Sequence, residues 1–353
     1  MSEKVLMKGN EALAEAAIAA GCKHFFGYPI TPQNELTAHM SKRLPKIGGT
    51  YLQAESEVAA INMVLGASAA GVRAMTSSSS PGISLKSEGL SYLAGSDLPA
   101  VIVNVQRAGP GLGGIQPSQA DYWQATRAAG HGDFKLLVFA PSTVQEMVDL
   151  TGDAFALGDK YRMPAIMLSD GILGQMMEPV VMPKDSIARI PERPWAACGH
   201  GDKREHNVIN SLYIEPPVLE AVIKARFEKY RLIEEKEQRC EEYLTDDADI
   251  VIVAYGASAR ISRSAVNAAR KEGIKAGLIR PITLWPFPTK AIISRIGNAK
   301  TFLCVEMSMG QMVDDVRLIV NGKRDVRFFG RTGGMVPTPA EVLGELKKIK
   351  GGI

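Results

Sequence analysis

Two polar side chains that follow two successive predicted strands are the most informative feature of the sequence. Thr31 ends the turn Gly27-Tyr28-Pro29-Ile30-Thr31, and Glu57 lies in the run that begins at Gln53. If the two strands belong to one α/β sheet, the hydroxyl and the carboxylate lie at the same edge of that sheet. Polar groups that converge at such an edge are typical of a ligand-binding site.

Both residues also have a plainer structural interpretation. Thr31 precedes Pro32, and a threonine N-cap followed by proline at the first helical position is a common helix start. An acidic residue in the first turn of a helix complements the helix dipole, which would account for Glu57. In the functional interpretation, Glu57 faces an apolar cofactor cleft and shares a proton with a ring nitrogen. The neighbouring Glu55 is the rival for that role.

An arginine at the same predicted sheet edge is the third candidate. Arg107 follows an apolar strand and precedes a loop, 108–114, that is rich in glycine. Such an arginine can bind a carboxylate with two parallel hydrogen bonds, although a solvated surface arginine is an equally good interpretation. The run Ser77 to Ser80 either lines a polar ligand or forms a turn, and His131 is a weaker candidate for polar contacts. The glycines match neither a dinucleotide fingerprint nor a P-loop.

The elements that would position these groups alternate between strand and helix up to about residue 180. Apolar runs without polar alternation predict strands at 24–26, 50–54, 73–77, 101–105, 136–139 and 165–168. Helices are predicted between them, including one that Asn10 caps and Gly21 ends, and one over 56–70. Uninterrupted apolar strands separated by helices indicate a doubly wound, mostly parallel α/β sheet covered on both faces.

The composition changes after residue 185. A stretch containing proline and glycine is followed by a charged helix, predicted over 217–243, that either braces two domains or lies in an interface. The βα pattern then resumes, with strands at 250–254, 276–279, 301–305 and 326–329. We therefore predict a first α/β domain at 1–185, a connector at 186–245 and a second, smaller α/β domain at 246–353.

The overall composition excludes several classes of protein. A net charge of +3 over 353 residues gives no reason to expect nucleic acid or an anionic membrane as a partner. No apolar run is long enough to span a bilayer, and the N-terminus lacks a signal-type core, so we expect a cytoplasmic protein. The four cysteines form no CxxC pair, which argues against a zinc site or an iron–sulfur cluster held by this chain alone.

The sequence resembles, over nearly its whole length, the α subunit of the 2-oxoacid:ferredoxin oxidoreductases. The motifs that carry this resemblance are Gly27-Tyr28-Pro29-Ile30-Thr31-Pro32, Ser56-Glu57, the segment from Thr76 to Gly82, Arg107, Gln116-Pro117-Ser118-Gln119-Ala120-Asp121, Arg280-Pro281-Ile282-Thr283, Trp285-Pro286-Phe287-Pro288 and Glu306-Met307-Ser308-Met309-Gly310-Gln311. The stretch from Glu57 to Arg107 looks alignable without gaps to the pyruvate enzyme.

Within that family, the likeness is greatest to subunits that act on branched-chain 2-oxoacids such as 2-oxoisovalerate. Gln33-Asn34 stands where the 2-oxoglutarate enzymes usually show two serines. Ser79-Ser80-Pro81-Gly82 and Gly111-Leu112-Gly113-Gly114 look like the branched-chain subgroup as well.

The resemblance implies thiamine diphosphate chemistry, with the first domain binding the pyrimidine half of the cofactor and the second being a transketolase C-terminal-like domain. Glu57 would match the glutamate that hydrogen-bonds the aminopyrimidine nitrogen N1′, Thr31 a threonine that contacts the substrate, and Arg107 an arginine that pairs with its carboxylate. The full set of cofactor contacts that it implies is Tyr28, Pro29, Ile30, Thr31, Glu57, Ser79 and Ser80. The protein would orient a cofactor that carries the difficult chemistry.

The implied enzyme is incomplete without partner subunits. The chain lacks the Gly-Asp-Gly and Asn signature of the diphosphate–magnesium half-site, to which Ser169-Asp170-Gly171 is the nearest approach. We therefore expect a β subunit that binds the diphosphate and Mg²⁺, together with iron–sulfur and γ-type subunits. The acyl group would pass to coenzyme A and the electrons to ferredoxin. No metal ligand is predicted in this chain.

Two other functions remain open at the level of sequence. A 2-oxoglutarate enzyme keeps the chemistry but needs a further basic residue for the second carboxylate, which the sequence does not identify. A non-catalytic assembly subunit keeps the fold and loses the cofactor, but it would have no need for Thr31, Glu57 and Arg107 together. The expected function is thus the α subunit of a branched-chain 2-oxoacid:ferredoxin oxidoreductase.

Overall fold

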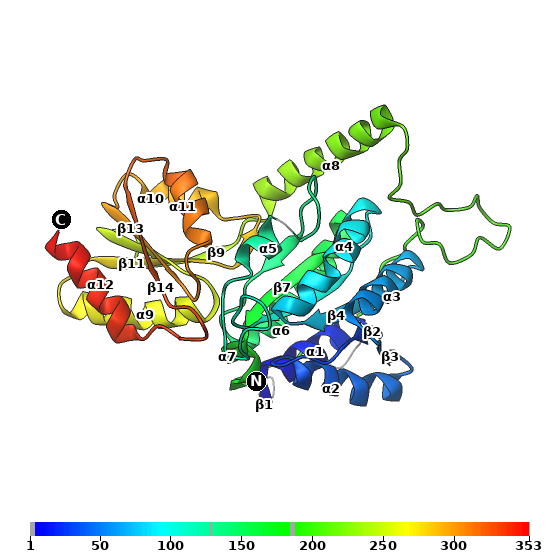
Figure 1. Cartoon of the computed structure of the whole chain (residues 1–353), viewed down its shortest axis with the longest axis horizontal. Helices are drawn as coiled ribbons and strands as arrows, with labels where there is room; N and C mark the ends of the chain where they lie inside the picture. The colour runs from blue at the N-terminus through cyan, green and yellow to red at the C-terminus, as the bar shows by residue number, and fades with distance from the viewer. Residues whose placement is uncertain (1–3, 128, 184–187, 353) are drawn as a thin grey trace.

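A computed structural model describes residues 4–127, 129–183 and 188–352 as two α/β units joined by a long helix (Figure 1). The N-terminal unit runs from blue to green in the figure and the C-terminal unit from yellow to red. The prediction of an α/β fold with a mostly parallel sheet is confirmed. Among the described residues, no helix combines the length and the apolar character needed to cross a membrane.

The first sheet has seven strands in the order β12-β6-β7-β5-β4-β2-β3, and all but β12 are parallel. Its strands are β2 (His24–Gly27), β3 (Thr50–Gln53), β4 (Ala74–Ser78), β5 (Val101–Gln106), β6 (Leu137–Phe139), β7 (Ala165–Asp170) and β12 (Thr283–Trp285). The central strands β4, β5 and β7 are buried along their whole length. Burial on both faces explains why β5 and β7 begin with apolar runs, Val101–Val103 and Ala165–Leu168, whereas β4 ends in buried Thr and Ser residues.

Helices cover both faces of this sheet. They are α1 (Gly9–Ala19), α2 (Asn34–Arg43), α3 (Glu57–Ala69), α4 (Ser80–Gly95), α5 (Tyr122–Thr126), α6 (Val144–Tyr161) and α7 (Gly171–Gln175), with a 3₁₀ turn at Leu44–Ile47. Helix α1 packs against α2 and α6, and α3 packs against α4. A two-stranded antiparallel ribbon of β1 (Val5–Lys8) and β8 (Met177–Val180) lies beside α1.

Two predicted helix starts are wrong. Helix α2 begins at Asn34 with Gln33 as its N-cap, so Thr31 is not the cap. Helix α1 begins at Gly9, so Asn10 lies inside it rather than before it. The side chain of Asn10 makes a tertiary contact, since it donates to the carbonyl of Pro32 at 2.9 Å, whereas the Thr31 hydroxyl accepts from the side chain of Asn34. Tertiary hydrogen bonding competes with capping for such side chains.

The second sheet has the order β14-β13-β10-β11-β9, with only β9 antiparallel. Its elements are β9 (Cys240–Tyr243), β10 (Ile250–Val253), α9 (Gly256–Lys271), β11 (Ala276–Pro281), α10 (Thr289–Arg295), β13 (Thr301–Glu306), α11 (Met312–Val320), β14 (Asp325–Gly330) and α12 (Pro339–Gly351). The predicted connector thus contains one strand of this sheet, β9. Strand β12, which lies in the chain between β11 and α10 of the second unit, pairs with β6 and so belongs to the first sheet.

Helix α8 (Pro216–Lys236) connects the two units and ends before the predicted limit at residue 243. Its buried stripe includes Arg226, Tyr230 and Ile233. Tyr230 stacks edge-on against Trp285 of β12, with ring centroids 5.7 Å apart. The segment 188–215 before the helix forms a long loop in Figure 1, and its first part packs on the first unit through the main-chain hydrogen bonds of Ala188 to Ala19 and of Ala197 to Ala69. Because α8 packs on the edge strand β12, it braces the first sheet where the second unit joins it.

Candidate functional site

The predicted site residues lie at the carboxyl ends of four neighbouring strands of the first sheet. In the sheet order β5-β4-β2-β3, Arg107 follows β5, Ser79 and Ser80 follow β4, Thr31 follows β2, and Glu57 follows β3. The expectation that Thr31 and Glu57 follow two paired strands is therefore confirmed. Such an edge of a parallel sheet is where α/β folds bind ligands.

The structure joins Thr31 and Arg107 directly. One terminal nitrogen of Arg107 donates to the main-chain carbonyl of Thr31, and the other donates to that of Leu112, both at 3.1 Å. The side-chain amide of Asn34 donates to the Thr31 hydroxyl at 3.3 Å. The Thr31 hydroxyl therefore accepts from Asn34, which leaves its own hydrogen free to donate to a ligand.

Arg107 is a buried residue rather than a solvated one. Only 6% of its surface is exposed, and its Nε has no hydrogen-bond partner. Its contact with Leu112 ties it to the glycine-rich loop, as expected from the sequence. A buried guanidinium with an unpaired donor is a favourable binding group for an anion.

Ser79 and Ser80 direct their hydroxyls into the protein. The hydroxyl of Ser79 donates to the carbonyl of Val105 at 2.8 Å. The hydroxyl of Ser80 lies 2.6 Å from a carboxylate oxygen of Asp121 and accepts from the main-chain N–H of Arg107 at 3.0 Å. Burial raises the pKa of Asp121. These contacts hold the ends of β4 and β5 together, so the predicted role of the two serines in cofactor binding has no free hydroxyl to support it.

Glu57 is the first residue of α3, and its carboxylate is enclosed. The residue is 6% exposed, whereas Glu55, the rival candidate, is exposed. The N-cap function at this helix belongs to Ser56, whose hydroxyl accepts from the main-chain N–H of Ala59 at 3.2 Å. Within residues 4–127, 129–183 and 188–352, no side chain donates a hydrogen bond to the Glu57 carboxylate. A carboxylate without a partner in the protein is available to accept a hydrogen bond from a ligand.

Other unpaired polar atoms surround this carboxylate. The hydroxyls of Thr76 and Ser78, at the end of β4, are buried without a hydrogen-bond partner. A Cβ atom added to Gly82 would lie 2.0 Å from the Ser78 hydroxyl and 2.6 Å from an oxygen of Glu57. Glycine is thus required at this point of α4 so that the two polar groups can lie against the helix backbone.

Lys86 is a site residue that the sequence interpretation missed. It is completely buried on α4, and its ammonium donates to the main-chain carbonyl of Glu57 at 3.4 Å. Burial lowers the pKa of Lys86 to about 8, and the charge of Glu57 partly opposes this shift. A signal was present, because residue 86 falls four positions after Gly82 and four before Leu90, on the apolar stripe of the helix.

A cavity of about 480 Å³ opens beside Thr31. Its lining includes Asn34, Ile115, Gln116 and Gln175. Tyr28 and Pro29 are exposed nearby and Ile30 is half-buried. The main-chain carbonyl of Tyr28 accepts from the side chain of Gln33 at 3.4 Å. The Tyr28–Thr31 turn thus presents its side chains outward, beside a cavity of the size that a small organic ligand occupies.

The remaining candidates lie away from this cluster. His131 lies in a loop against Ser91. Asp170 caps α7 by accepting from the N–H groups of Ile172 and Leu173, and burial raises its pKa to about 6. The four cysteines are free. In the part of the chain that the structure describes, no group of three or more His, Cys, Asp or Glu side chains could hold a metal ion.

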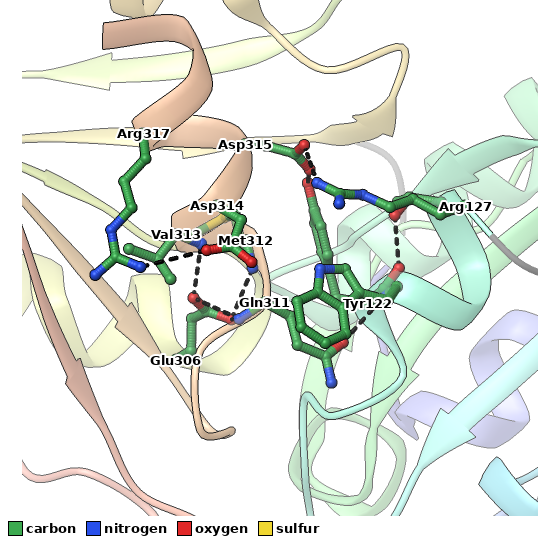
Figure 2. Close-up of polar contacts among 11 residues, drawn as sticks. Tyr122, Arg127, Glu306, Gln311, Met312, Val313, Asp314, Asp315 and Arg317 are labelled. Carbon is green, nitrogen blue, oxygen red and sulfur yellow. Dashed lines mark hydrogen bonds and ion pairs between the residues drawn. The ribbon is translucent and has the colours of Figure 1, made fainter. Parts of the chain in front are cut away.

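A second buried polar cluster joins the two units (Figure 2). The carboxylate of Glu306 accepts hydrogen bonds of 3.0 to 3.3 Å from the main-chain N–H groups of Gln311, Met312 and Val313 at the start of α11. Asp315 of the same helix binds Tyr122 and Arg127 of the first unit. This cluster involves the end of the predicted motif 306–311.

The predicted motif 116–121 belongs to the same joint. The side chain of Gln119 donates to Tyr255 at 2.9 Å and accepts from Ser258 at 2.7 Å. It also accepts from the main-chain N–H of Met307 at 3.0 Å. Because each of these partners lies in the second unit, Gln119 fixes the second unit to the first, whereas Gln116 and Pro117 of the same motif line the cavity beside Thr31.

Two family models match consecutive parts of the chain. The first, described as pyruvate flavodoxin/ferredoxin oxidoreductase, thiamine diphosphate-binding, matches residues 15–241. The second, described as pyruvate:ferredoxin oxidoreductase core domain II, matches residues 248–342. Together they span most of both α/β units.

Several curated relatives match nearly the whole chain. The ketoisovalerate oxidoreductase subunit VorB of Methanothermobacter thermautotrophicus is 51% identical over 346 residues, which cover 98% of each chain. The 2-oxoglutarate synthase subunit KorA of Methanothermobacter marburgensis is 36% identical and covers 99% of this chain and 100% of its own.

The solved structures agree with these matches. The 2-oxoglutarate:ferredoxin oxidoreductase of Magnetococcus marinus superimposes with a TM-score of 0.85 at 28% identity, over 98% of this chain and 65% of the longer one. A split-gene transketolase shares the fold, with a TM-score of 0.60 at 13% identity. The chain therefore belongs to the 2-oxoacid:ferredoxin oxidoreductase family, whose N-terminal domain binds thiamine diphosphate.

Proposed function

We propose that the chain is the α subunit of a 2-oxoacid:ferredoxin oxidoreductase that acts on branched-chain substrates and contributes the pyrimidine half of a thiamine diphosphate site. The observation that carries this proposal is the buried, unpartnered carboxylate of Glu57 beside Gly82. An isolated buried carboxylate needs a donor, and a ring nitrogen of an aminopyrimidine provides one. The residues present therefore fit this half of the cofactor.

When bound, thiamine diphosphate supplies the carbon nucleophile that makes decarboxylation of a 2-oxoacid possible. In the proposed mechanism the Glu57 carboxylate would accept a hydrogen bond from N1′. Sharing this proton would shift charge between the carboxylate and the ring. Tyr28, Pro29 and Ile30 form the outward surface of the turn that would contact the ring and its partner subunit.

Thr31 and Arg107 are proposed to hold the substrate. The Thr31 hydroxyl has a free hydrogen for the 2-oxo group, because it accepts from Asn34. The unpaired Nε of Arg107 is suited to the substrate carboxylate. Since Arg107 also donates to the carbonyl of Thr31, the two groups are held in one arrangement. Orientation of this kind lowers the entropy cost of the reaction.

Catalysis is proposed to need partner subunits. The described residues offer no group of metal ligands and no cysteine pair for a cluster. The diphosphate, Mg²⁺ and the iron–sulfur clusters would then lie in β, γ and iron–sulfur subunits of a cytoplasmic complex that passes an acyl group to coenzyme A and electrons to ferredoxin. Mass spectrometry of the complex purified without oxygen tests this composition. A chain that purifies alone and still turns over would contradict it.

The substrate preference rests on the 51% identical ketoisovalerate oxidoreductase subunit and on the apolar residues near Thr31. Leu112 and Ile115 are exposed beside the site, and they suit a branched aliphatic group better than a second carboxylate. A panel of 2-oxoacids offered to the complex should give the highest kcat/KM for 2-oxoisovalerate. A higher value for 2-oxoglutarate would reverse the assignment, since relatives named as 2-oxoglutarate synthase subunits are also similar to this chain.

A further inference from the structure

The buried ammonium of Lys86 is unusual because nothing in its surroundings is built to stabilise a cation. Lys86 is 0% exposed, and its single hydrogen bond, to the carbonyl of Glu57, is long at 3.4 Å. An ammonium has three donors. Across the described segments 4–127, 129–183 and 188–352, no carboxylate forms an ion pair with it.

The position is also electrostatically unfavourable in another respect. Glu57 is the first residue of α3, so the ammonium lies at the positive end of that helix dipole. Burial and the dipole both oppose a positive charge there, and burial accordingly lowers the pKa of Lys86. The charge of Glu57 opposes this lowering, and the long hydrogen bond to the Glu57 carbonyl also favours the ammonium.

The packing of α4 on α3 aims Lys86 at Glu57. A Cβ atom at Gly89 would lie 2.5 Å from the side chain of Ile61 on α3, and one at Gly82 would meet Glu57. Residues 82, 86 and 89 fall on one face of α4, since side chains three or four positions apart share a face. The two glycines let the helices approach closely, and Lys86 is the long side chain enclosed between these two contacts.

We propose that Lys86 is a positioning residue for the reaction, whose ammonium holds the first turn of α3 and the charge of Glu57 in place for the cofactor. The inference rests on the proposed function, in which Glu57 binds the cofactor ring. The charge of Glu57 favours the ammonium of Lys86, so the two groups interact electrostatically as well as through the backbone. The bond from Lys86 to the Glu57 carbonyl fixes the backbone from which the carboxylate extends.

The test uses the assembled complex with Lys86→Met, which keeps the length of the side chain and removes its charge. Three quantities are measured: kcat with 2-oxoisovalerate, the Kd for thiamine diphosphate and the midpoint of thermal unfolding. Lys86→Met should lower kcat by about tenfold and weaken cofactor binding, without lowering the midpoint. Ser87→Ala is the matched control, because its hydroxyl bonds only within α4, to Ile83. The control should match the unaltered complex in all three quantities.

A double-mutant cycle separates positioning from a general structural role. In a Glu57→Gln background, Lys86→Met should have no further effect on kcat or Kd, because Lys86 acts through Glu57. Unchanged kcat and Kd in the single variant, or effects that add to those of Glu57→Gln, would overturn the inference. So would a fall in the unfolding midpoint, or failure of both Lys86→Met and Lys86→Gln to assemble. If Glu57→Gln itself leaves turnover unchanged, the proposed function fails instead.

Discussion

Two buried polar clusters in this chain differ in how completely their groups are paired. At the joint between the two units, Glu306 receives hydrogen bonds from three main-chain N–H groups (Figure 2). The hydroxyl of Ser308 also donates to Glu306. At the edge of the first sheet, the hydroxyl of Ser78 and the Nε of Arg107 are buried without a partner, and the carboxylate of Glu57 accepts no hydrogen bond within the described residues. Both clusters are buried to a similar degree.

This difference distinguishes a structural cluster from a site. Leaving a buried polar group unpaired costs roughly 1–3 kcal/mol, so folding alone favours the complete pairing found around Glu306. Several unpaired groups in one place are retained where a ligand completes them. The comparison therefore assigns the joint to stability and the sheet edge to chemistry, and each prediction below can break that assignment.

The largest expected effect belongs to Glu57. Glu57→Gln in the complex should lower kcat by at least about 100-fold, because the amide does not share a proton with the cofactor ring. The full chain should unfold at a similar denaturant concentration, since within the described residues this carboxylate makes no hydrogen bond and acts on the fold only through its charge on Lys86. Glu55→Gln, at an exposed position two residues away, is the control and should keep full activity. Equal losses in both variants would assign the effect to helix α3 rather than to the site.

The second prediction concerns how the contribution of Lys86 to folding stability depends on pH. Its pKa falls from 10.5 to about 8 on folding. Below pH 8 the lysine is charged in both states, and the folded state carries a penalty on the order of 3 kcal/mol. Between pH 8 and 10.5 the unfolded chain holds a proton that the folded chain has released, so stability rises with pH. Lys86→Met should thus be more stable than the natural chain at pH 7, by a margin that shrinks toward pH 10.5.

Urea unfolding of the full chain and of Lys86→Met, at pH 7 and at pH 10, measures this margin. The difference between the two chains cancels the titration of other groups, apart from Glu57, whose charge acts on Lys86. A variant that is less stable at pH 7 would mean that Lys86 supports the fold. In that case the sheet edge would resemble the joint between the units.

The joint should respond in the opposite way. Glu306→Gln replaces one acceptor oxygen with an amide that faces backbone donors, so the variant should lose roughly 2 kcal/mol of unfolding free energy. Asp314→Asn on the same helix is the control, because its ion pair with Arg317 is exposed and worth little. If the complex assembles, kcat should stay within about twofold of the natural value, since no group of the site contacts Glu306. A large loss of kcat without a loss of stability would contradict the structural assignment.

Much of the fold could be predicted because strands that are buried on both faces contain runs of apolar residues in the sequence. The strands from 101 and 165 begin with apolar runs because helices cover both faces of the sheet. Thr31, Glu57 and Arg107 follow such strands, so their common edge was predictable. Tertiary pairing was not: β12 leaves the second unit to pair with β6, and nothing local in Thr283–Trp285 indicates that partner.

The errors at the helix ends have the same origin. Thr31 has the residue type of an N-cap, but the chain continues through Gln33, whose side chain accepts from Ser77 of β4 and from Thr37. Helix α8 ends at Lys236 because Cys240–Tyr243 pairs with β11. Capping rules and charge patterns describe local preferences, and long-range hydrogen bonds override them.

The smallest predicted effect concerns Gly82. It tests whether the unpaired groups beside this glycine form part of the cofactor-binding site. Gly82→Ala should raise the Kd for thiamine diphosphate by about tenfold, because its Cβ would meet the Ser78 hydroxyl and the Glu57 carboxylate. Gly66→Ala in helix α3 is the matched control, since a Cβ there meets nothing within 4 Å. The control should bind normally and gain about 0.5–1 kcal/mol of stability from the helix.

Calorimetric titration of the two complexes with the cofactor separates the possible results. A Kd that changes only in Gly82→Ala means that the space beside Glu57 is part of the binding site. A Kd that changes in neither variant means that the carboxylate can move aside, so its lack of a partner would be unrelated to the ligand. That result would remove the distinction between the two clusters, because the sheet edge would then be an incompletely paired part of the core.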